Sequence, residues 1–259
     1  MVRRAHHERL KRMGPMIAAL VPAKRLSQAK GRLAAVLSDE ERRRLALAML
    51  ADVLAPLLAV PRIQTTAVVS SDPQVLALAR SLGAEAIVEP PPARDVNAAL
   101  TFAARALARW GIEALLVVPM DVPLLAAADV EAILDALPFG RGVVLCPSRA
   151  GGTSALALRP PDAVPFRFGP ESFAAHCYEA ALRGLSPTVL RIESLMLDID
   201  SPADLANLLA SPCPELAERA HDTRSHRALR DMGIPERLGL PSSEAKGLPP
   251  PARAARDRL

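Results

Sequence analysis

Aromatic residues are scarce in this 259-residue chain, where one Trp, one Tyr and five Phe make up 3% of the total. Half of the residues are nonetheless hydrophobic, so the chain can bury a sizeable core built mainly from Ala, Leu and Val. No apolar run approaches the roughly 20 residues that a membrane-spanning helix needs. The stretch from His6 to Arg12 is polar where a signal peptide would be apolar. We therefore expect no membrane partner.

Cysteine is also rare. Cys146, Cys177 and Cys213 are odd in number and widely spaced, and no two of them have the short spacing of a metal-binding motif. Thiols in this arrangement are typical of a reducing compartment, so the sequence predicts a cytoplasmic protein with free cysteines.

An excess of positive charge is missing from the body of the chain, although the isoelectric point is about 9.3. Residues 1–15 carry five Lys and Arg against one acid, and residues 211–259 carry nine against seven. Residues 16–210 carry 18 Lys and Arg against 20 Asp and Glu. A body that binds nucleic acid would concentrate positive charge, with aromatic residues for stacking if it held single strands. Nucleic acid is therefore not an expected partner.

The two ends of the chain differ from its body in composition. Residues 1–15 are polar and basic, and we predict that they form a disordered extension. Residues 211–259 are rich in Pro and Arg, with scattered apolar residues. We predict that this tail is largely disordered, with a helical piece near 215–232. The folded domain is expected over 16–210.

Apolar runs alternate with helical patterns inside this domain. The patterns predict strands at 16–21, 64–70, 85–88, 114–119, 143–147, 153–158 and 188–192. They predict helices at 39–59, 73–82, 96–110, 127–136, 171–183 and 202–210. Near-continuous apolar strands that alternate with helices predict an α/β fold, with a mostly parallel central sheet covered on both faces.

A basic segment, VPAKRLSQAKGRLA at 21–34, follows the first predicted strand. In a parallel sheet, ligands bind beyond the carboxyl ends of the strands. The small residues between the cations would let a polyphosphate approach the backbone of this segment. The alternative interpretation of the segment is a solvated basic loop without a ligand. The candidate phosphate-binding and catalytic cations are Lys24, Arg25, Lys30 and Arg32.

Three carboxylates also fall at predicted strand ends. Asp121 follows the strand at 114–119, and Asp198 and Asp200 lie two residues apart near the end of the domain. On an extended segment, residues two apart point the same way. Together the three would form an oxygen-only site suited to Mg²⁺ and phosphates, whereas each alone could be an ordinary loop or turn residue.

Two further segments could bind an anion. Gly151 and Gly152, followed by Thr153, permit close approach of a ligand to the backbone, although a Gly-Gly pair is also a common hairpin turn. The segment FGPES at 168–172 contains Gly169 and Ser172 at a predicted helix start, where free N–H groups attract anions.

Asn97 and His176 each allow more than one interpretation. Asn97 opens a predicted helix, where its amide could bond either a nucleobase or a backbone group. His176 lies on the helix after FGPES, and we interpret it as a packing or rim residue in preference to a catalytic base.

Six segments occur in a characteristic order: VPAKRLSQAKGRLA, RDVNAAL, VPMDVPLL, CPSRAGGTSALAL, FGPESFAAH and LDIDSPADLANLL. Together, over about 16–210, they resemble the CofC/FbiD family, the guanylyltransferases of coenzyme F420 biosynthesis. The resemblance implies a Rossmann-like nucleotidyltransferase fold of the glycosyltransferase-A kind. It also implies transfer of GMP from GTP to a three-carbon phospho-acid, with release of diphosphate. The acceptor would be 2-phospho-L-lactate, phosphoenolpyruvate or 3-phospho-D-glycerate.

The resemblance assigns roles to the candidate residues. Two departures from the usual pattern are PMDVPL in place of PADLPL, which keeps the carboxylate, and GGTS in place of GGTN, which puts a contact from Ser154 in doubt. The basic segment would neutralise the triphosphate and the leaving diphosphate. The implied Mg²⁺ ligands are Asp121, Asp198 and Asp200, and the implied phospho-acid contacts are Thr153, Gly169 and Ser172. Apart from the resemblance, we predict nucleotide contacts at Asn97, Gly151 and Gly152.

Two other functions stay open. The first is a nucleotidyltransferase of the same fold that acts on a sugar phosphate or on the molybdopterin cofactor. Such enzymes usually carry a GxG-type loop with Arg after the first strand, where this chain has PAKRLSQAKGRL. The second is a non-catalytic protein that binds GTP. The identity of the acceptor, the preference for guanine over adenine and the oligomeric state, a homodimer included, are not decided by the residues.

Overall fold

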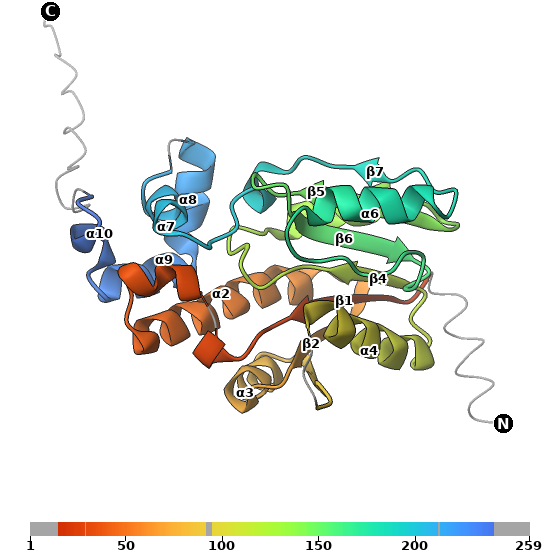
Figure 1. The fold of residues 1–259 in the computed structure, drawn as a ribbon, viewed down its shortest axis with the longest axis horizontal. Helices are drawn as coiled ribbons and strands as arrows, with labels where there is room; N and C mark the ends of the chain where they lie inside the picture. Colours follow the sequence, from red (N-terminus) through yellow and green to blue (C-terminus); the bar gives the residue numbers. More distant parts are fainter. Residues whose placement is uncertain (1–14, 29, 92–94, 212, 241–259) are drawn as a thin grey trace, which may run out of the picture.

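A seven-stranded sheet forms the centre of the computed structural model, which describes residues 15–28, 30–91, 95–211 and 213–240 (Figure 1). The strand order is β3-β2-β1-β4-β6-β5-β7. Among the described strands, only β6 runs antiparallel to its neighbours. The predicted α/β fold with a mostly parallel sheet is therefore confirmed. The strands are β1 (Ile17–Pro22), β2 (Ile63–Ser70), β3 (Glu85–Val88), β4 (Ala114–Val117), β5 (Gly142–Pro147), β6 (Thr153–Arg159) and β7 (Thr188–Val189).

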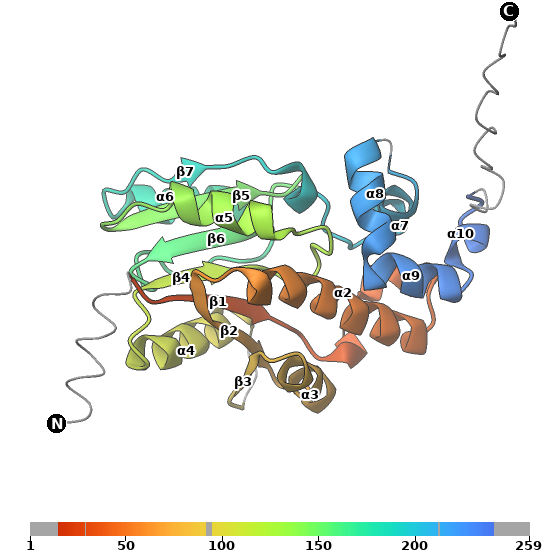
Figure 2. The same ribbon diagram turned by 180° about the vertical axis from the view of Figure 1, so that it is seen from behind.

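Helices cover both faces of the sheet (Figures 1 and 2). One face carries α2 (Asp39–Ala59), α3 (Pro73–Ser81) and α5 (Ala127–Ala136), and the other carries α4 (Val96–Arg109) and α6 (Ser172–Ala181). Successive side chains of a strand point to opposite faces. In β1, Ala19 and Val21 pack with the first group of helices, whereas Ala18 and Leu20 pack with the second. The two apolar layers consist mainly of Ala, Leu and Val, as the composition predicts.

Local capping explains where several helices begin. The Ser38 hydroxyl accepts the Glu41 N–H, and the Glu41 carboxylate accepts the Ser38 N–H, which forms a capping box at α2. Ser201 and Asp204 form the same arrangement at α7 (Pro202–Leu209). These bonds satisfy N–H groups that have no partner within the helix, and so they stabilise its first turn. Because the paired residues lie three positions apart, the start of the helix can be predicted from the sequence. The predicted starts of both helices are confirmed.

The prediction of a largely disordered tail from 211 is wrong as far as Leu240, whereas the helical piece predicted near 215–232 is confirmed. This segment forms α8 (Pro214–Asp222), α9 (Arg224–Asp231) and α10 (Ile234–Arg237). Leu216, Leu229 and Ile234 are buried in a third apolar cluster with residues of α2 and α7. The composition is misleading because each helix supplies few apolar residues, and the rest of the cluster comes from distant parts of the chain. The predictions for 1–14 and 241–259 concern residues outside the described ranges.

Helix α9 is fixed to α2 through a buried carboxylate. Asp52 accepts the Arg224 N–H at 2.8 Å, the Ser225 N–H at 2.8 Å and the Ser225 hydroxyl at 2.5 Å. Burial raises the pKa of Asp52, although these hydrogen bonds act in the opposite direction. The carboxylate thus satisfies the free N–H groups of the α9 N-terminus and ties the last helices to the domain.

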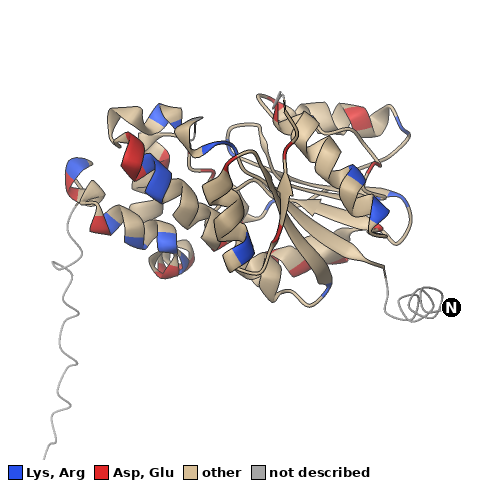
Figure 3. Ribbon diagram, turned by 90° about the horizontal axis from the view of Figure 1, so that it is seen from below, with Lys and Arg blue, Asp and Glu red and all other residues tan. Residues whose placement is uncertain are grey.

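Charged residues of both signs are spread over the helices and loops, and the strands carry few of them (Figure 3). In the described ranges, no helix has the length and apolar character that crossing a membrane requires.

Candidate active site

The connections of β1 bring the candidate residues to one edge of the sheet. β1 pairs with β2 on one side and β4 on the other, so the chain order reverses between β1 and β4. In open α/β sheets, ligands bind at such a switch point, beyond the carboxyl ends of the strands. The loops after β1 and β4 end at this edge. The turn between β5 and β6 also lies there, because β6 runs antiparallel to β4 and begins where β4 ends.

Lys30 joins two of the predicted carboxylates. Its Nζ lies 3.0 Å from Asp121 Oδ2 and 3.0 Å from Asp200 Oδ1, and its side chain is only 7% exposed. The Ile199 N–H donates to the Asp121 carbonyl at 2.9 Å, which holds the 198–200 segment beside the loop after β4. Lys30 has a φ of 55°, in the left-handed region that non-glycine residues seldom adopt. The chain therefore accepts backbone strain to place this ammonium group between the carboxylates.

Opposite effects act on the pKa values of these groups. Burial alone would lower the pKa of Lys30, but Asp121 and Asp200 outweigh it, so the pKa is raised. Burial acts to raise the pKa of Asp200, but the attraction of Lys30 outweighs it and the pKa is lowered. Asp198 has a raised pKa because it is half-buried and lies near other carboxylates, Asp121 and Asp200 among them. This edge of the sheet therefore concentrates negative charge, which Lys30 only partly neutralises.

The donor atoms here are of the kind that Mg²⁺ prefers, namely carboxylate oxygens. In the described part of the chain, however, no three His, Cys, Asp or Glu side chains are grouped closely enough to hold a metal ion. The structure brings Asp121 and Asp200 together through the Lys30 ammonium, and Asp198 joins them only electrostatically. The residues fit Mg²⁺ by chemistry, but Lys30 occupies the position between Asp121 and Asp200, two of the three predicted ligands.

The other predicted cations do not form one wall. Arg25 Nε donates to Ser71 Oγ at 3.1 Å, so this side chain is directed to the connection between β2 and α3. Lys24 and Arg32 are exposed. Arg32 lines a cavity of about 260 Å³ together with Asp198 and Asp200. Of the four cations, the structure thus places Lys30 and Arg32 beside the carboxylates, Lys24 near enough to help lower the pKa of Asp200, and Arg25 elsewhere.

The turn between β5 and β6 is a hairpin that α6 packs against. The Gly152 N–H donates to Ser148 Oγ at 3.1 Å, and Gly151 has a φ of 79°, which favours glycine. A Cβ on Gly152 would lie 2.9 Å from Ser148 Oγ, too close for a larger residue. The Phe173 N–H donates to the Gly151 carbonyl and links the turn to α6. The hairpin interpretation of this pair is therefore confirmed, and its contact with a nucleotide stays a prediction.

A register shift at the start of β6 turns Thr153 toward α6. Cys146 pairs with Ala155 and Pro147 pairs with Thr153, so Ser154 has no cross-strand partner. Ala155 faces the α2 side of the sheet, and without the shift Thr153 would face that side too. An extra residue in a strand commonly redirects a side chain in this way. Ser154 Oγ is buried and has no hydrogen-bond partner among the described residues.

Thr153 and Ser172, which were both predicted as phospho-acid contacts, lie together. Ser172 Oγ is 3.2 Å from Thr153 Oγ1, and the Ser172 N–H donates to the Gly169 carbonyl. His176 Nδ1 lies 3.0 Å from Thr153 Oγ1, and His176 is fully buried. Our interpretation of His176 as a packing residue missed this contact. Its position four residues after Ser172, on the same side of a helix, was the available signal.

The structure corrects the assignment of Asn97 as a nucleotide contact. Asn97 Nδ2 donates to the Phe168 carbonyl at 2.9 Å, and Asn97 Oδ1 accepts the Phe168 N–H at 2.7 Å. Both ends of the amide are therefore bonded to the backbone of the FGPES segment. Asn97 holds this segment against α4, which is the second of the two roles that the sequence allowed.

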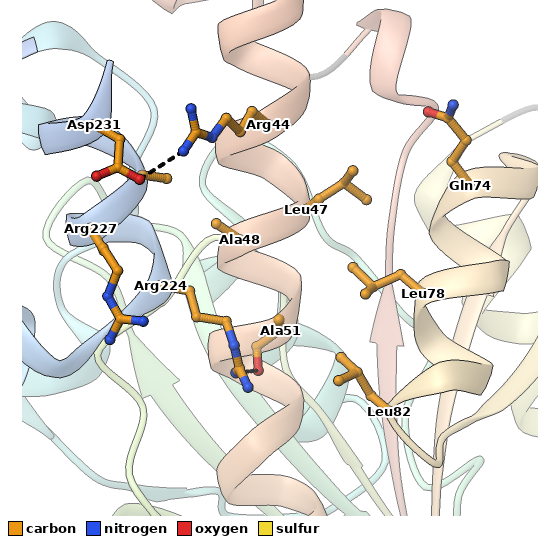
Figure 4. A pocket seen from close by; sticks show the side chains of 11 residues that line it. Arg44, Leu47, Ala48, Ala51, Gln74, Leu78, Leu82, Arg224, Arg227 and Asp231 are labelled. Atoms are coloured by element: carbon orange, nitrogen blue, oxygen red, sulfur yellow. Dashed lines mark hydrogen bonds and ion pairs between the residues drawn. The ribbon is translucent and has the colours of Figure 1, made fainter. Parts of the chain in front are cut away.

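Another hollow, of about 400 Å³, lies between α2, α3 and α9 (Figure 4). Leu47, Leu78 and Leu82 form its apolar side, and Arg224 and Arg227 project from α9 on the other side. None of the predicted site residues lines it.

Comparison with known proteins assigns a family to this arrangement. The profile of the family described as guanylyl transferase CofC like matches residues 17–235, which include α8, α9 and the whole sheet. The chain belongs to the CofC guanylyltransferase family. As a CofC-family member it is a nucleotidyltransferase, which confirms the family resemblance and the enzyme class predicted from the sequence.

Curated relatives of this CofC-family chain carry three different names. A phosphoenolpyruvate guanylyltransferase of Sphaerobacter thermophilus is 44% identical over 191 residues, 73% of this chain and 91% of that protein. A 3-phospho-D-glycerate guanylyltransferase of Phenylobacterium zucineum is 40% identical over 190 residues, 71% and 86% of the two chains. A 2-phospho-L-lactate guanylyltransferase of Methanothermobacter thermautotrophicus is 39% identical over 191 residues, 74% and 83% of the two chains.

The fold has relatives among solved structures. A nucleotide-diphospho-sugar transferase, described as putative, from Desulfovibrio desulfuricans superposes with a TM-score of 0.67 at 15% identity. The match covers 86% of this chain and 98% of that one. At this identity the likeness concerns the fold, which is the predicted nucleotidyltransferase fold.

Proposed function

We propose that this chain transfers GMP from GTP to a three-carbon phospho-acid, with release of diphosphate, in a Mg²⁺-dependent step of coenzyme F420 biosynthesis. The acceptor class is 2-phospho-L-lactate, phosphoenolpyruvate or 3-phospho-D-glycerate. Relatives named for each of these acids are 39%, 44% and 40% identical to this chain. Because the three identities are close, they support the class of acceptor and do not select one member.

The observation that carries the proposal is the joining of Asp121 and Asp200 through Lys30 at the switch point of the sheet. GTP and a phospho-acid are both anions, and carboxylates would repel them unless a cation lies between. Mg²⁺ held by Asp121, Asp198 and Asp200 would neutralise phosphate charge and polarise the reacting phosphoryl group. Lys30 and Arg32 lie beside the same carboxylates and are suited to the same phosphates.

The chemistry needs little from the protein beyond alignment and charge. An oxygen of the acceptor phosphate attacks the α-phosphorus of GTP and forms a new P–O bond. The bond from that phosphorus to the bridging oxygen breaks, and diphosphate leaves with the electron pair. A phosphate monoester is largely ionised near neutral pH, since its second pKa is about 6, so no strong general base is required. Catalysis then depends on holding the reactants in line and on fixed positive charge.

Thr153 and Ser172 are suited to hold the acceptor. Their hydroxyls lie 3.2 Å apart near the Gly151-Gly152 turn, and they can bond an oxyanion without adding charge. The Arg149 N–H contacts the Met196 carbonyl at 3.4 Å, which joins the turn to the segment that carries Asp198 and Asp200. The hydroxyl pair and the carboxylates are therefore parts of one edge.

A diphosphate-release assay tests the proposal. The full chain is incubated with Mg²⁺ and GTP together with each of the three acids in turn, and with ATP or CTP in place of GTP as nucleotide controls. We expect release with GTP and at least one acid, and little release when glucose 1-phosphate replaces the acid. Absence of release with all three acids would refute the proposal.

A further inference from the structure

His176 bonds with both of its ring nitrogens. Nε2 lies 2.9 Å from the Arg167 backbone nitrogen, and Nδ1 lies 3.0 Å from Thr153 Oγ1. A backbone N–H can only donate, so Nε2 must be the acceptor. In a neutral imidazole the single hydrogen is then on Nδ1, and Nδ1–H donates to the Thr153 hydroxyl oxygen. The Arg167 backbone thus selects one tautomer of His176.

This tautomer decides the direction of the next hydrogen bonds. Thr153 Oγ1 accepts from His176, so the Thr153 hydrogen is not spent on the ring. Thr153 and Ser172 share one bond, at 3.2 Å, which uses one of their two hydroxyl hydrogens. Whichever way that bond runs, one O–H hydrogen of the pair is left over. Among the described residues no acceptor is bonded to it.

We propose that His176 is a positioning residue that makes the Thr153–Ser172 pair a hydrogen-bond donor to an oxyanion of the phospho-acid. The identity of the ligand in this inference rests on the proposed function. The tautomer of His176 does not depend on that function, because it follows from the Arg167 N–H and the ring geometry. With the opposite tautomer, Nδ1 would be an acceptor and would take the Thr153 hydrogen. The hydroxyl pair would then have lost the hydrogen that an anionic ligand needs.

Surrounding groups keep the ring neutral and oriented. The pKa of His176 is lowered to about 4, chiefly because the ring is buried and also because Arg167 lies nearby, and these effects outweigh the Ser172 backbone and Glu179, which act to raise it. Arg167 and Arg183 are themselves ion-paired with Glu179. The Phe168 ring meets the imidazole edge-on, with centroids 5.0 Å apart. At neutral pH these neighbours therefore stabilise the neutral donor form.

The first test measures the tautomer directly. Ring ¹⁵N chemical shifts of histidine-labelled full-length protein, without ligand, distinguish a protonated Nδ1 from a protonated Nε2. The His176 signals are identified by their loss in His176→Asn. We expect a protonated Nδ1 at pH 7, and a protonated Nε2 would overturn the proposal whether or not the chain has the proposed activity.

The second test compares variants in the diphosphate-release assay. His176→Asn keeps an amide N–H near the Nδ1 position, whereas His176→Phe fills the space without any donor. We expect His176→Phe to raise the KM for the phospho-acid by about tenfold to a hundredfold, with the KM for GTP unchanged. His176→Asn should recover most of this loss. His226→Asn, at a buried histidine of α9, is the matched control and should leave both KM values unchanged.

Two results of the second test would contradict the proposal. An equal rise in both KM values for His176→Phe would indicate a merely structural role, as would the absence of recovery in His176→Asn. Thermal unfolding of each variant establishes that it is folded before its kinetics are compared. Failure of the wild-type chain to release diphosphate would instead refute the proposed function and with it the assigned ligand, and the ¹⁵N result would then decide the tautomer alone.

Discussion

The two halves of the site hold their polar groups in different ways. In the carboxylate half, formed by Asp121, Asp198 and Asp200, like charges lie together and only the strained Lys30 bridges them. In the hydroxyl half, formed by Thr153, Ser172 and His176, the groups are uncharged, buried and bonded to one another. Under the proposed function, the first half would have to exchange partners when an ion or a phosphate binds, whereas the second half would already be arranged for the phospho-acid.

The largest effect is expected from removing a charge in the carboxylate half. Asp200→Asn replaces one carboxylate with a neutral amide, so the site loses attraction both for Mg²⁺ and for Lys30. We expect turnover to fall by at least about a hundredfold while the protein stays folded, as measured by diphosphate release at saturating Mg²⁺. Asp121→Asn should behave alike, and the exposed Asp162→Asn is the control. Wild-type turnover in the Asp200 variant would refute the metal assignment.

Lys30→Met tests whether Asp121 and Asp200 bind Lys30 and a divalent cation in competition. The substitution keeps an apolar stem of similar length but removes the cation that competes for Asp121 and Asp200. We expect Mn²⁺, used as a spectroscopic probe for Mg²⁺, to bind roughly tenfold more tightly, while turnover falls by a similar factor. Electron paramagnetic resonance titration measures the first and diphosphate release the second. Weaker binding of Mn²⁺ would show that Lys30 supports the ion and does not compete with it.

In the hydroxyl half, Asn97→Ala removes two hydrogen bonds to the Phe168 backbone. We expect the free energy of unfolding to fall by about 1–3 kcal/mol, as measured in urea. The KM for the phospho-acid should rise about threefold to tenfold with the KM for GTP unchanged, because the freed segment positions His176. Thr101→Ala, one turn further along α4, is the control. A selective rise in the KM for GTP would restore Asn97 to nucleotide binding.

The smallest effect concerns stability and pH. The raised pKa of Asp198 means that the folded protein holds a proton there more tightly than the unfolded chain does. Ionisation of Asp198 at neutral pH therefore costs folding free energy, and Asp198→Asn removes that cost. We expect the Tm of the variant to be higher by roughly 1–3 °C at pH 7. The difference should vanish as the pH falls below the ordinary Asp value of 3.8, and a variant less stable at pH 7 would contradict this account.

Much of the fold could be predicted because its signals are local. The boundaries of α2 and α7 depend on Ser38, Ser201 and their partners three residues later, and the alternation of β1 assigns its two faces. The helical piece predicted near 215–232 corresponds to α8 and α9, but the packing of these helices on the domain could not be found this way. Leu216 and Leu229 are buried in a cluster that also contains Leu45 and Met49 of α2, and no window of sequence contains both groups.

In the site, too, some features have a local signal in the sequence and others depend on distant residues. Asp121, Asp200, Thr153 and Ser172 were selected from the sequence because residues after strands meet at one edge of a parallel sheet, or because the family resemblance assigned them. The contacts that these side chains make in the structure were not predicted from the sequence. A lysine that bonds two carboxylates 91 and 170 residues away, and an asparagine bonded to a backbone 71 residues away, depend on tertiary structure alone.

The unpaired Ser154 has a consequence for how this strand can change. A strand assigns its faces by parity, so odd-numbered and even-numbered positions of β6 lie on opposite sides, and Ser154 is where the parity reverses. Residues after it form the core, and the one before it, Thr153, belongs to the site. Loss of Ser154 would place Thr153 directly before Ala155 and still opposite Pro147, so the strand would become regular while the Thr153 hydroxyl stayed on the α6 side. The site therefore depends on the pairing of Thr153 with Pro147, and Ser154 is the extra residue that this pairing leaves over.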